Sequence, residues 1–286
     1  EYSVAKQLGI QASIYKPSFI IGTGDNFYYF GVKSSNDSLF KKDFEDVYNH
    51  SSLMVPWYHT LGNHDYAYNP DAQTKYKSPY KRWIMPSRYF YKRIKLDKNN
   101  YASLIFLDTS PCVNDYINND STKWDPCSPN FPTPIDCRFH QNILNQSCSE
   151  QYYWLNKTLN NISNKDWIIV AGHHPANEID NQDFASLLAG KNINLYLNGH
   201  AHELRHYQIN NKGCWITTGA GSMVSTDSET NDNISNNNTS NNTSNNENDR
   251  ENNVNNTNNN TSTTNNFEGF IRRIADMENN QNSEFS

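Results

Sequence analysis

Short apolar runs alternate with polar stretches of helical period along most of the chain. Apolar runs of this length are typical of strands buried on both faces, and the polar stretches between them are typical of covering helices. The sequence therefore predicts a layered α/β fold with a mixed sheet. The predicted strands are Phe19–Ile21, Val55–Leu61, Ser103–Leu107, Trp167–Val170, Ile193–Leu197 and Trp215–Thr217, and the predicted helices are Leu39–Tyr48, Glu150–Leu159 and Gln182–Leu188.

The N-terminal segment places Val4, Leu8, Ile10 and Ile14 at helical spacing. This spacing predicts an amphipathic helix that packs through those side chains. The chain starts inside this helix and does not open with Met, so we expect that a preceding piece, signal peptide included, has been removed.

The composition changes near Ser225. From residue 225 to 266 nearly every residue is Asn, Ser, Thr, Asp or Glu, which leaves too little apolar surface to offset the entropy of ordering the backbone. We predict that 225–266 is a disordered low-complexity segment and that 1–224 is one domain with a well-buried core. Residues 267–286 are expected to be a C-terminal remnant with no assigned fold.

The chain carries a formal net charge of −6. Binding to a nucleic-acid backbone needs clustered basic residues, so this balance argues against a nucleic-acid partner. No apolar run reaches the roughly 18 to 20 residues that a membrane span requires. The sequence therefore predicts neither a nucleic-acid partner nor a membrane span. It does not indicate an oligomeric state.

Four of the five cysteines, Cys112, Cys127, Cys137 and Cys148, lie in one loop region. Two disulfides among them would place the protein in the secretory pathway, the extracellular space or a vacuole. A zinc cluster is the alternative, although no C-x-x-C pair is present. Cys214 is left over and is expected to be a buried free thiol. Candidate N-glycosylation sites occur at Asn36, Asn49, Asn119, Asn145, Asn156 and Asn161.

Four motifs rich in metal-binding side chains follow predicted strands: Gly24–Tyr28, Gly62–Asp65, Gly172–Pro175 and Gly199–His202. Glycine lets the backbone turn sharply there, and ligands of α/β sheets bind outside the carboxyl ends of strands. Each motif alone has an ordinary interpretation as a turn. Because all four stand at strand ends, their Asp, Asn, His and Tyr donors predict a site for Fe, Mn or Zn.

The order and spacing of these motifs resemble the tartrate-resistant, animal-type purple acid phosphatases of the calcineurin-like metallophosphoesterase superfamily. The resemblance covers residues 1–224 and implies an α/β/β/α sandwich with mixed sheets, here lacking the first strand and C-terminal strands. It implies an acid phosphatase that hydrolyses small phosphate monoesters by a metal-bound hydroxide. Further matching segments are Phe44–Val47, Val55–Tyr58, Lys81–Trp83, Leu107–Thr109 and Gly219–Gly221.

The resemblance also implies a dinuclear centre of Fe(III) and a divalent ion, which would be Fe, Zn or Mn. The implied metal ligands are Asp25, which bridges both ions, Tyr28 and His202 for the ferric ion, and Asn63, His173 and His200 for the divalent ion. His64 would bind the phosphate and protonate the leaving oxygen, the alternative being a histidine that only supports the ligands by hydrogen bonding.

Two departures from the family pattern affect these expectations. The family's first motif, an upstream Asp ligand of the ferric ion, has no counterpart in the sequence, so we expect a weak ferric site. A further active-site His of the family is replaced by Gln182. Proton delivery is therefore left open among His64, His174, Glu178 and Asp180.

Two other functions are compatible with the same motifs. A phosphodiesterase or nucleotidase of this fold is one, but Tyr28 marks the purple branch and is generally missing from such relatives. A catalytically dead scaffold or membrane-complex subunit is the other. Because such a protein is expected to have lost ligands, the intact ligand set argues against it.

Overall fold

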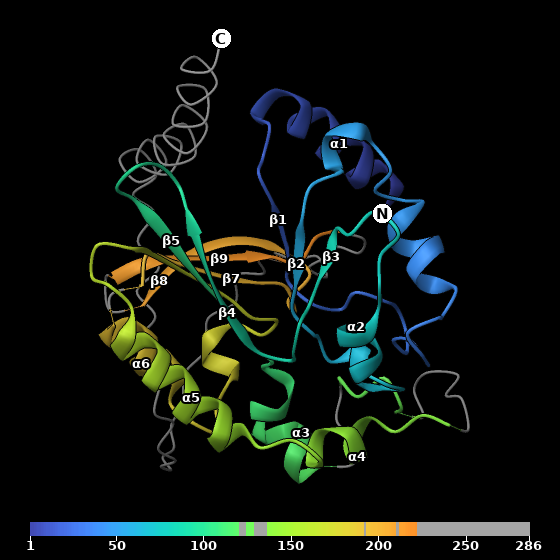
Figure 1. The fold of residues 1–286 in the computed structure, drawn as a ribbon. Coiled ribbons are helices and arrows are strands. Elements are labelled where there is room, and N and C mark those ends of the chain that lie inside the picture. The colour runs from blue at the N-terminus through green and yellow to red at the C-terminus, as the bar shows by residue number, and fades with distance from the viewer. Residues whose placement is uncertain (120–123, 129–135, 192, 210–211, 222–286) are drawn as a thin grey trace, which may run out of the picture.

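Two β-sheets lie at the centre of the computed structural model, with helices on their outer sides (Figure 1). The structure describes residues 1–119, 124–128, 136–191, 193–209 and 212–221. The predicted disordered segment 225–266 and the C-terminal remnant 267–286 lie outside the described residues, so the predicted domain limits stay a prediction.

The smaller sheet is parallel and has the strand order β1-β2-β3. The larger sheet has the order β4-β5-β6-β7-β9-β8, and only its two edge strands, β4 and β8, run antiparallel to their neighbours. The strands are β1 (Ile20–Gly22), β2 (Trp57–His59), β3 (Trp83–Ile84), β4 (Phe90–Lys95), β5 (Tyr101–Phe106), β6 (Trp167–Ala171), β7 (Leu195–Asn198), β8 (Leu204–Ile209) and β9 (Lys212–Thr218).

Six α-helices and five short helical turns surround the sheets in the described part of the chain. The helices are α1 (Tyr2–Tyr15), α2 (Asp71–Lys75), α3 (Asn114–Asn118), α4 (Phe139–Leu144), α5 (Cys148–Asn161) and α6 (Phe184–Gly190). The turns are η1 (Phe40–Glu45), η2 (Ser51–Leu53), η3 (His64–Tyr66), η4 (Ser110–Cys112) and η5 (Ala176–Glu178). In Figure 1, α5 and α6 cover the larger sheet, and α1 stands at the smaller one.

Strand β5 shows how the larger sheet is buried on both faces. Leu104 and Phe106 belong to the core shared with the smaller sheet, where Phe106 stacks on Tyr58 of β2 with ring centroids 5.6 Å apart. Ile105 and Leu107 point the other way, into a second core with α5 and α6. Because successive side chains alternate between faces, one continuous apolar run fills both cores. The predicted α/β/β/α architecture is confirmed.

Helix α1 forms where the sequence predicts a helix, but its packing face differs from the prediction. Ala5, Gly9 and Ala12 are buried, whereas Val4 and Ile14 are 41% and 64% exposed. A Cβ at Gly9 would come within 2.8 Å of the His50 side chain. The helix therefore packs mainly through its small residues, which allow close approach; of the predicted apolar positions Leu8 packs against the core, whereas Val4, Ile10 and Ile14 are exposed.

The four clustered cysteines form the disulfides Cys112–Cys148 and Cys127–Cys137. This confirms the two predicted disulfides and leaves no thiolate of the cluster for zinc. Cys214 is free and half-buried. None of the described helices is both long and apolar enough to span a bilayer.

Candidate metal centre

The four predicted motifs meet at one edge of the two sheets. Asp25 follows β1, Asn63 follows β2, His173 follows β6 and His200 follows β7. Parallel strands present their carboxyl ends on the same side, which brings the loops together. A Cβ at Gly62 would overlap the Asp25 carboxylate, so glycine is required there for the loops after β1 and β2 to approach.

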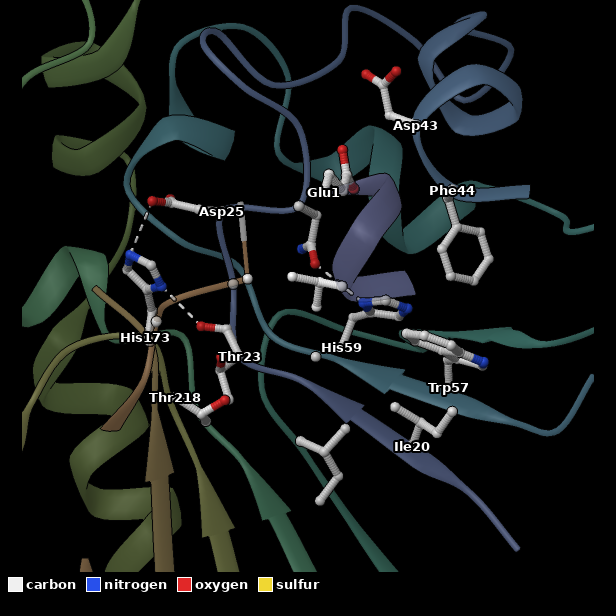
Figure 2. A pocket seen from close by; sticks show the side chains of 18 of the residues that line it. Glu1, Ile20, Thr23, Asp25, Asp43, Phe44, Trp57, His59, His173 and Thr218 are labelled. Atoms are coloured by element: carbon white, nitrogen blue, oxygen red, sulfur yellow. Dashed lines mark hydrogen bonds and ion pairs between the residues drawn. The ribbon is translucent and has the colours of Figure 1, made fainter. Parts of the chain in front are cut away.

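A cavity of about 600 Å³ leads from the outer side of β1 to this edge (Figure 2). Its walls near α1 include the apolar Ile20, Phe44 and Trp57 as well as the carboxylates of Glu1 and Asp43, while Asp25 and His173 line its far end. Of the motif side chains, Asp25, Tyr28, His173 and His202 line this cavity.

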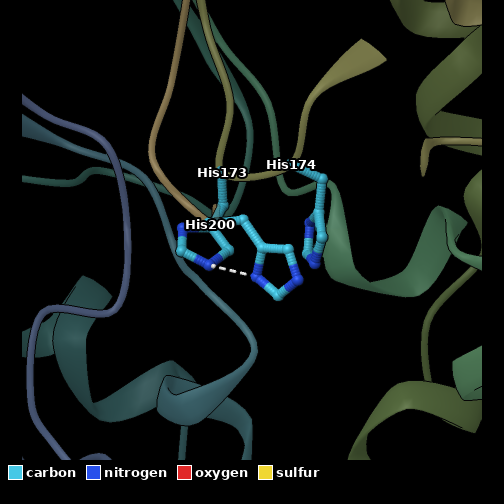
Figure 3. Close-up of side chains that lie close together, drawn as sticks. All are labelled: His173, His174 and His200. Atoms are coloured by element: carbon cyan, nitrogen blue, oxygen red, sulfur yellow. Dashed lines mark hydrogen bonds between the residues drawn. The ribbon is translucent and has the colours of Figure 1, made fainter. Parts of the chain in front are cut away.

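The most buried part of the centre, called here the buried half, consists of Asn63, His173 and His200. Asn63 Oδ1 lies 3.1 Å from His173 Nε2 and 3.1 Å from His200 Nδ1. The two imidazole nitrogens are 3.2 Å apart, and Figure 3 marks their contact with a dashed line. Three donor atoms from three separate loops thus converge on one point.

The hydrogen bonds behind these atoms determine which lone pairs face inward. Asn63 Nδ2 donates to the carbonyl of Trp124 at 2.8 Å, which turns Oδ1 toward the histidines. His173 Nδ1 lies 2.8 Å from the carbonyl of Thr23 and donates to it, so Nε2 is the nitrogen that faces Asn63 and carries the lone pair of the neutral ring. Neutral nitrogen and amide oxygen lone pairs at this spacing are suited to a cation such as Zn²⁺, Mn²⁺ or Fe²⁺. The residues present fit a metal ion.

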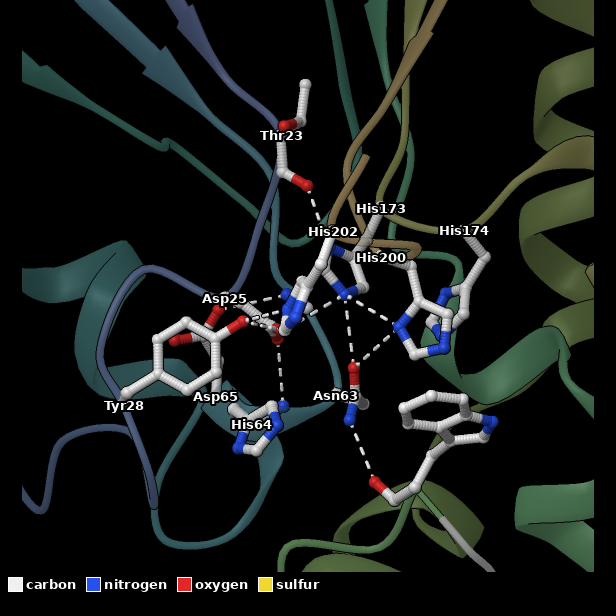
Figure 4. A network of polar contacts seen from close by, with 12 residues as sticks. Thr23, Asp25, Tyr28, Asn63, His64, Asp65, His173, His174, His200 and His202 are labelled. Carbon is white, nitrogen blue, oxygen red and sulfur yellow. Dashed lines mark hydrogen bonds and ion pairs between the residues drawn. The ribbon is translucent and has the colours of Figure 1, made fainter. Parts of the chain in front are cut away.

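Tyr28 and His202, called here the open half, lie on the other side of Asp25 and are only partly buried (Figure 4). The Tyr28 hydroxyl donates to Asp25 Oδ2 at 2.9 Å and lies 2.8 Å from His202 Nε2. The same Asp25 oxygen is 3.3 Å from His173 Nε2. The Asp25 carboxylate therefore joins the two halves.

Two of these residues have left-handed backbones. The φ angle is 51° at Asp25 and 50° at His202. Residues with a side chain rarely adopt this conformation, and it is concentrated at functional sites. Next to His202, a Cβ at Gly219 would overlap the carbonyl of Gly199, so the loop after β7 turns tightly against the end of β9.

The charges of the centre are strongly coupled. Burial alone would raise the pKa of Asp25, but the nearby His173 and His64 outweigh it and hold the pKa well below its usual range. Burial lowers the pKa of His200 to about 3, which keeps that imidazole neutral and able to bind a cation. Burial and the Asp25 charge raise the pKa of Tyr28.

His64 stands next to Asn63 and faces the open half. Its amide donates to Asp25 Oδ1 at 3.0 Å, and its Nδ1 lies 2.7 Å from the carbonyl of Tyr29. A carbonyl only accepts, so Nδ1 carries a proton and Nε2 is left to face outward. The ring centroid is 4.5 Å from that of Tyr28.

His174 lies deeper than the sequence suggests. It is fully buried, with Nδ1 2.7 Å from Thr109 Oγ1 and Nε2 3.1 Å from the Tyr116 hydroxyl. Burial, followed by the neighbouring His200 imidazole, lowers its pKa well below the usual value. Although its ring groups with His173 and His200 in a potential metal cluster, both its nitrogens already have partners.

The other proton-transfer candidates separate clearly. Glu178 Oε2 is 3.7 Å from His200 Nε2 with 41% of its side chain exposed, and burial raises its pKa. Asp180 instead accepts from the amide of Asn114 at 2.7 Å.

Sequence reasoning missed Trp124, whose ring centroid is 5.0 Å from that of His200. No motif marks it, because its bond to Asn63 uses the main chain.

Comparisons with known proteins find similar sequences and a similar fold. The model of the calcineurin-like phosphoesterase family matches residues 2–204. The tartrate-resistant acid phosphatase type 5 of Rattus norvegicus is 32% identical over an alignment of 237 residues, which covers 78% of this chain and 67% of the relative. Purple acid phosphatase 7 of Arabidopsis thaliana is 31% identical over 77% of this chain and 64% of its own length.

A solved structure is also similar. The GAP50 anchor in the inner membrane complex of Plasmodium aligns with a TM-score of 0.55 and 25% identity, over 77% of this chain and 66% of that one. The chain thus spans about two thirds of the length of the proteins it matches.

Proposed function

The chain belongs to the calcineurin-like phosphoesterase family, and from this premise we propose that it is a metal-dependent phosphatase that hydrolyses phosphate monoesters. The convergence of lone pairs from Asn63, His173 and His200 carries the proposal. Acceptor atoms this close repel one another unless a proton or a cation lies between them, and a bound cation satisfies all three at once.

The proposed ligands divide between two ions, with Asp25 shared. Asn63, His173 and His200 hold a divalent ion, which is Fe, Zn or Mn, and Tyr28 and His202 hold Fe(III). The phenol and carboxylate of the open half suit a hard trivalent ion once the phenol is deprotonated. Two bound cations supply Lewis acidity, which polarises the phosphoryl group and neutralises the charge that develops on it.

His64 is the proposed catalytic acid. The carbonyl of Tyr29 accepts the Nδ1 proton and fixes the ring, so a protonated Nε2 is directed outward toward a bound ester. There it contacts the phosphate and transfers its proton to the leaving oxygen, which departs as an alcohol. His174 supports this centre rather than delivering protons, because Thr109 and Tyr116 occupy both its nitrogens.

The preference for monoesters over diesters rests on Tyr28. Its hydroxyl lies between Asp25 and His202, where the resemblance to purple acid phosphatases places a phenolate ligand. A phosphodiesterase or nucleotidase activity of the same fold is the alternative within the enzyme class.

The proposal is tested by measuring metal content and hydrolysis of p-nitrophenyl phosphate in mildly acidic buffer with the protein made at its full length. We expect two metal ions per chain and turnover of the monoester well above that of bis-p-nitrophenyl phosphate. Less than one bound ion together with no hydrolysis above buffer would overturn the enzyme assignment.

A scaffold role is the second candidate, and the similarity to the GAP50 anchor favours it. An anchor needs the fold but not the ligands, whereas all six proposed ligand side chains are present in this chain. Protein that carries no metal when isolated from its own cells, and that co-purifies with a membrane complex, would support the scaffold over the phosphatase.

We also propose that the protein resides in the secretory pathway, outside the cell or in a vacuole, as a glycoprotein. The two disulfides support this, because thiols stay reduced in the cytosol. Candidate glycosylation sites at Asn36, Asn49, Asn145 and Asn161 are exposed. Native protein whose cysteines are all reduced and whose mass does not change with an N-glycosidase would contradict this location.

A further inference from the structure

Asp65 closes the motif Gly62–Asp65, but nothing in the proposed reaction uses it. Its residue is 0% exposed, and its carboxylate is not among the atoms that converge on the metal centre. A buried carboxylate is costly unless donors surround it. Its donors, with distances to the carboxylate oxygens, are Gly62 N (2.9 Å), Asn26 N (3.1 Å), Asn26 Nδ2 (3.3 Å), Phe27 N (3.3 Å) and Gln73 Nε2 (2.7 Å).

These donors come from both metal-binding loops. The amides of Asn26 and Phe27 directly follow Asp25, and the amide of Gly62 directly precedes Asn63. One carboxylate therefore holds together the loop after β1 and the loop after β2. Such a bridge fixes the distance between the two ligands more firmly than either loop could alone.

The conformation of the first loop needs this support. Gly24 and Asp25 have φ angles of 91° and 51°, so two successive residues are left-handed. For Asp25 this conformation is strained and persists only where the surroundings hold it. Because the next two amides both point at the Asp65 carboxylate, that carboxylate stabilises the turn that aims Asp25 at the centre.

Further hydrogen bonds hold the loops after β1 and β2 in place. Asn26 Nδ2 also donates to the carbonyl of Thr60 at 2.7 Å and to Gln73 Oε1 at 3.0 Å. Its Oδ1 therefore accepts from His59 Nδ1 at 3.1 Å. The network ends on two buried side chains, Gln73 of α2 and His59 of β2. It therefore supports the metal-binding loops without contributing a ligand to the centre.

We propose that Asp65 is a positioning residue that sets the spacing between Asp25 and Asn63 and thereby the metal affinity of the whole centre. The inference rests on the proposed function only in that these loops bind metal. It makes a distinct statement, namely that a carboxylate that touches no ion controls how tightly the ions are held.

The test compares Asp65→Asn with Asp166→Asn in the full chain. Asp166 is a buried carboxylate that accepts from Arg93 and Ser103 before β6, at the strand end opposite the metal-binding loops. Both substitutions keep the side-chain shape and remove a charge that accepts several hydrogen bonds. Mn²⁺ affinity is measured by titration calorimetry on metal-free protein, and the melting temperature of each variant is recorded beside it.

We expect both variants to melt at lower temperature than the unsubstituted protein. Only Asp65→Asn should bind Mn²⁺ more weakly, by about 10- to 100-fold, the usual effect of losing a group that supports metal ligands. Unchanged Mn²⁺ affinity in Asp65→Asn, or an equal loss in Asp166→Asn, would overturn the inference. If the unsubstituted protein binds no Mn²⁺, it is the proposed function that fails.

A second variant covers the case in which Asp65→Asn does not fold. Gln73→Met keeps the volume but removes one donor to Asp65 and one acceptor for Asn26. A folded Gln73→Met protein should lose Mn²⁺ affinity by a smaller factor than Asp65→Asn, about 3- to 10-fold by the same reasoning. Full Mn²⁺ affinity in this variant would also contradict the inference.

Discussion

The two halves of the metal centre differ in how firmly the protein holds their side chains. In the buried half, the carbonyls of Thr23 and Trp124 fix His173 and Asn63 from behind. In the open half, the Tyr28 hydroxyl bonds to Asp25 and His202, which belong to the centre themselves. The buried half is therefore preorganised by the scaffold, whereas the open half is held through its own ligands.

This difference has a consequence for metal binding. A preorganised site binds an ion without ordering its ligands first, so the ion is held more tightly and exchanges more slowly. We expect the buried half to load first and to release its ion last when a chelator is added. Asp25 contacts both halves, so loss of its carboxylate should weaken ion binding in both of them.

The largest effect is expected from Asp25→Asn, because it removes the carboxylate that both halves share. Metal content should fall in both halves, and hydrolysis should drop by more than about 100-fold, beyond the usual effect of a group that only supports ligands. Elemental analysis and phosphatase assays measure both quantities. Asp43→Asn is the control, since Asp43 lines the same cavity without being a proposed ligand; retention of two ions by Asp25→Asn would show that the halves are independent.

Tyr28→Phe changes a ligand of the open half alone, so its effect on metal content and activity should be intermediate in size. The ring stays but the hydroxyl that meets Asp25 and His202 is lost. We expect the buried half to keep its ion, visible absorption of the iron-loaded protein to disappear, and activity to fall about 10-fold, as for the weaker supporting groups. Absorption spectra and metal content provide the measurement. A variant that stays coloured would show that Tyr28 does not bind iron.

The smallest effect on the centre is expected from the double substitution of Cys127 and Cys137 by Ser. This disulfide anchors the segment whose Trp124 carbonyl holds Asn63. We expect the buried half to bind its ion about 3-fold more weakly, below the usual range for a directly bonded group, and the open half to be unchanged.

The two disulfides also allow a comparison of their contributions to stability. Cys112 and Cys148 are separated by 36 residues and Cys127 and Cys137 by 10. Chain entropy predicts that opening the longer loop costs about 1 kcal/mol more in the free energy of unfolding. Denaturant titration of the two double-Ser variants measures this difference, and a larger loss from the shorter loop would contradict the entropic account.

The central strands of the larger sheet were predictable from the sequence, and its edge strands β4 and β8 were not. β5, β6 and β7 are buried on both faces, so they appear as continuous apolar runs. β4 is an edge strand in which only Phe90 is buried, and its Lys and Arg residues hide the pattern. The face of α1 was mispredicted because contact through Ala and Gly leaves no mark in a hydrophobicity pattern.

The candidate site divides in the same way. The motif side chains could be found because glycine and strand ends mark them, and the structure brings Asp25, Asn63, His173 and His200 together. Trp124 could not be found, because its contribution to Asn63 is a main-chain carbonyl, which every residue has. The depth of His174 also depends on tertiary packing that no local pattern encodes.

The distance along the chain between Asp25 and His202 determines when the centre can form during synthesis. A ribosome adds about 5 to 20 residues per second, and N-terminal segments emerge first. The loop after β7 turns against the end of β9, and β9 lies between β7 and β8 in the sheet. A nascent chain that stops before residue 218 therefore lacks a strand on which the last ligands depend, so metal uptake marks a chain that has been made through β9.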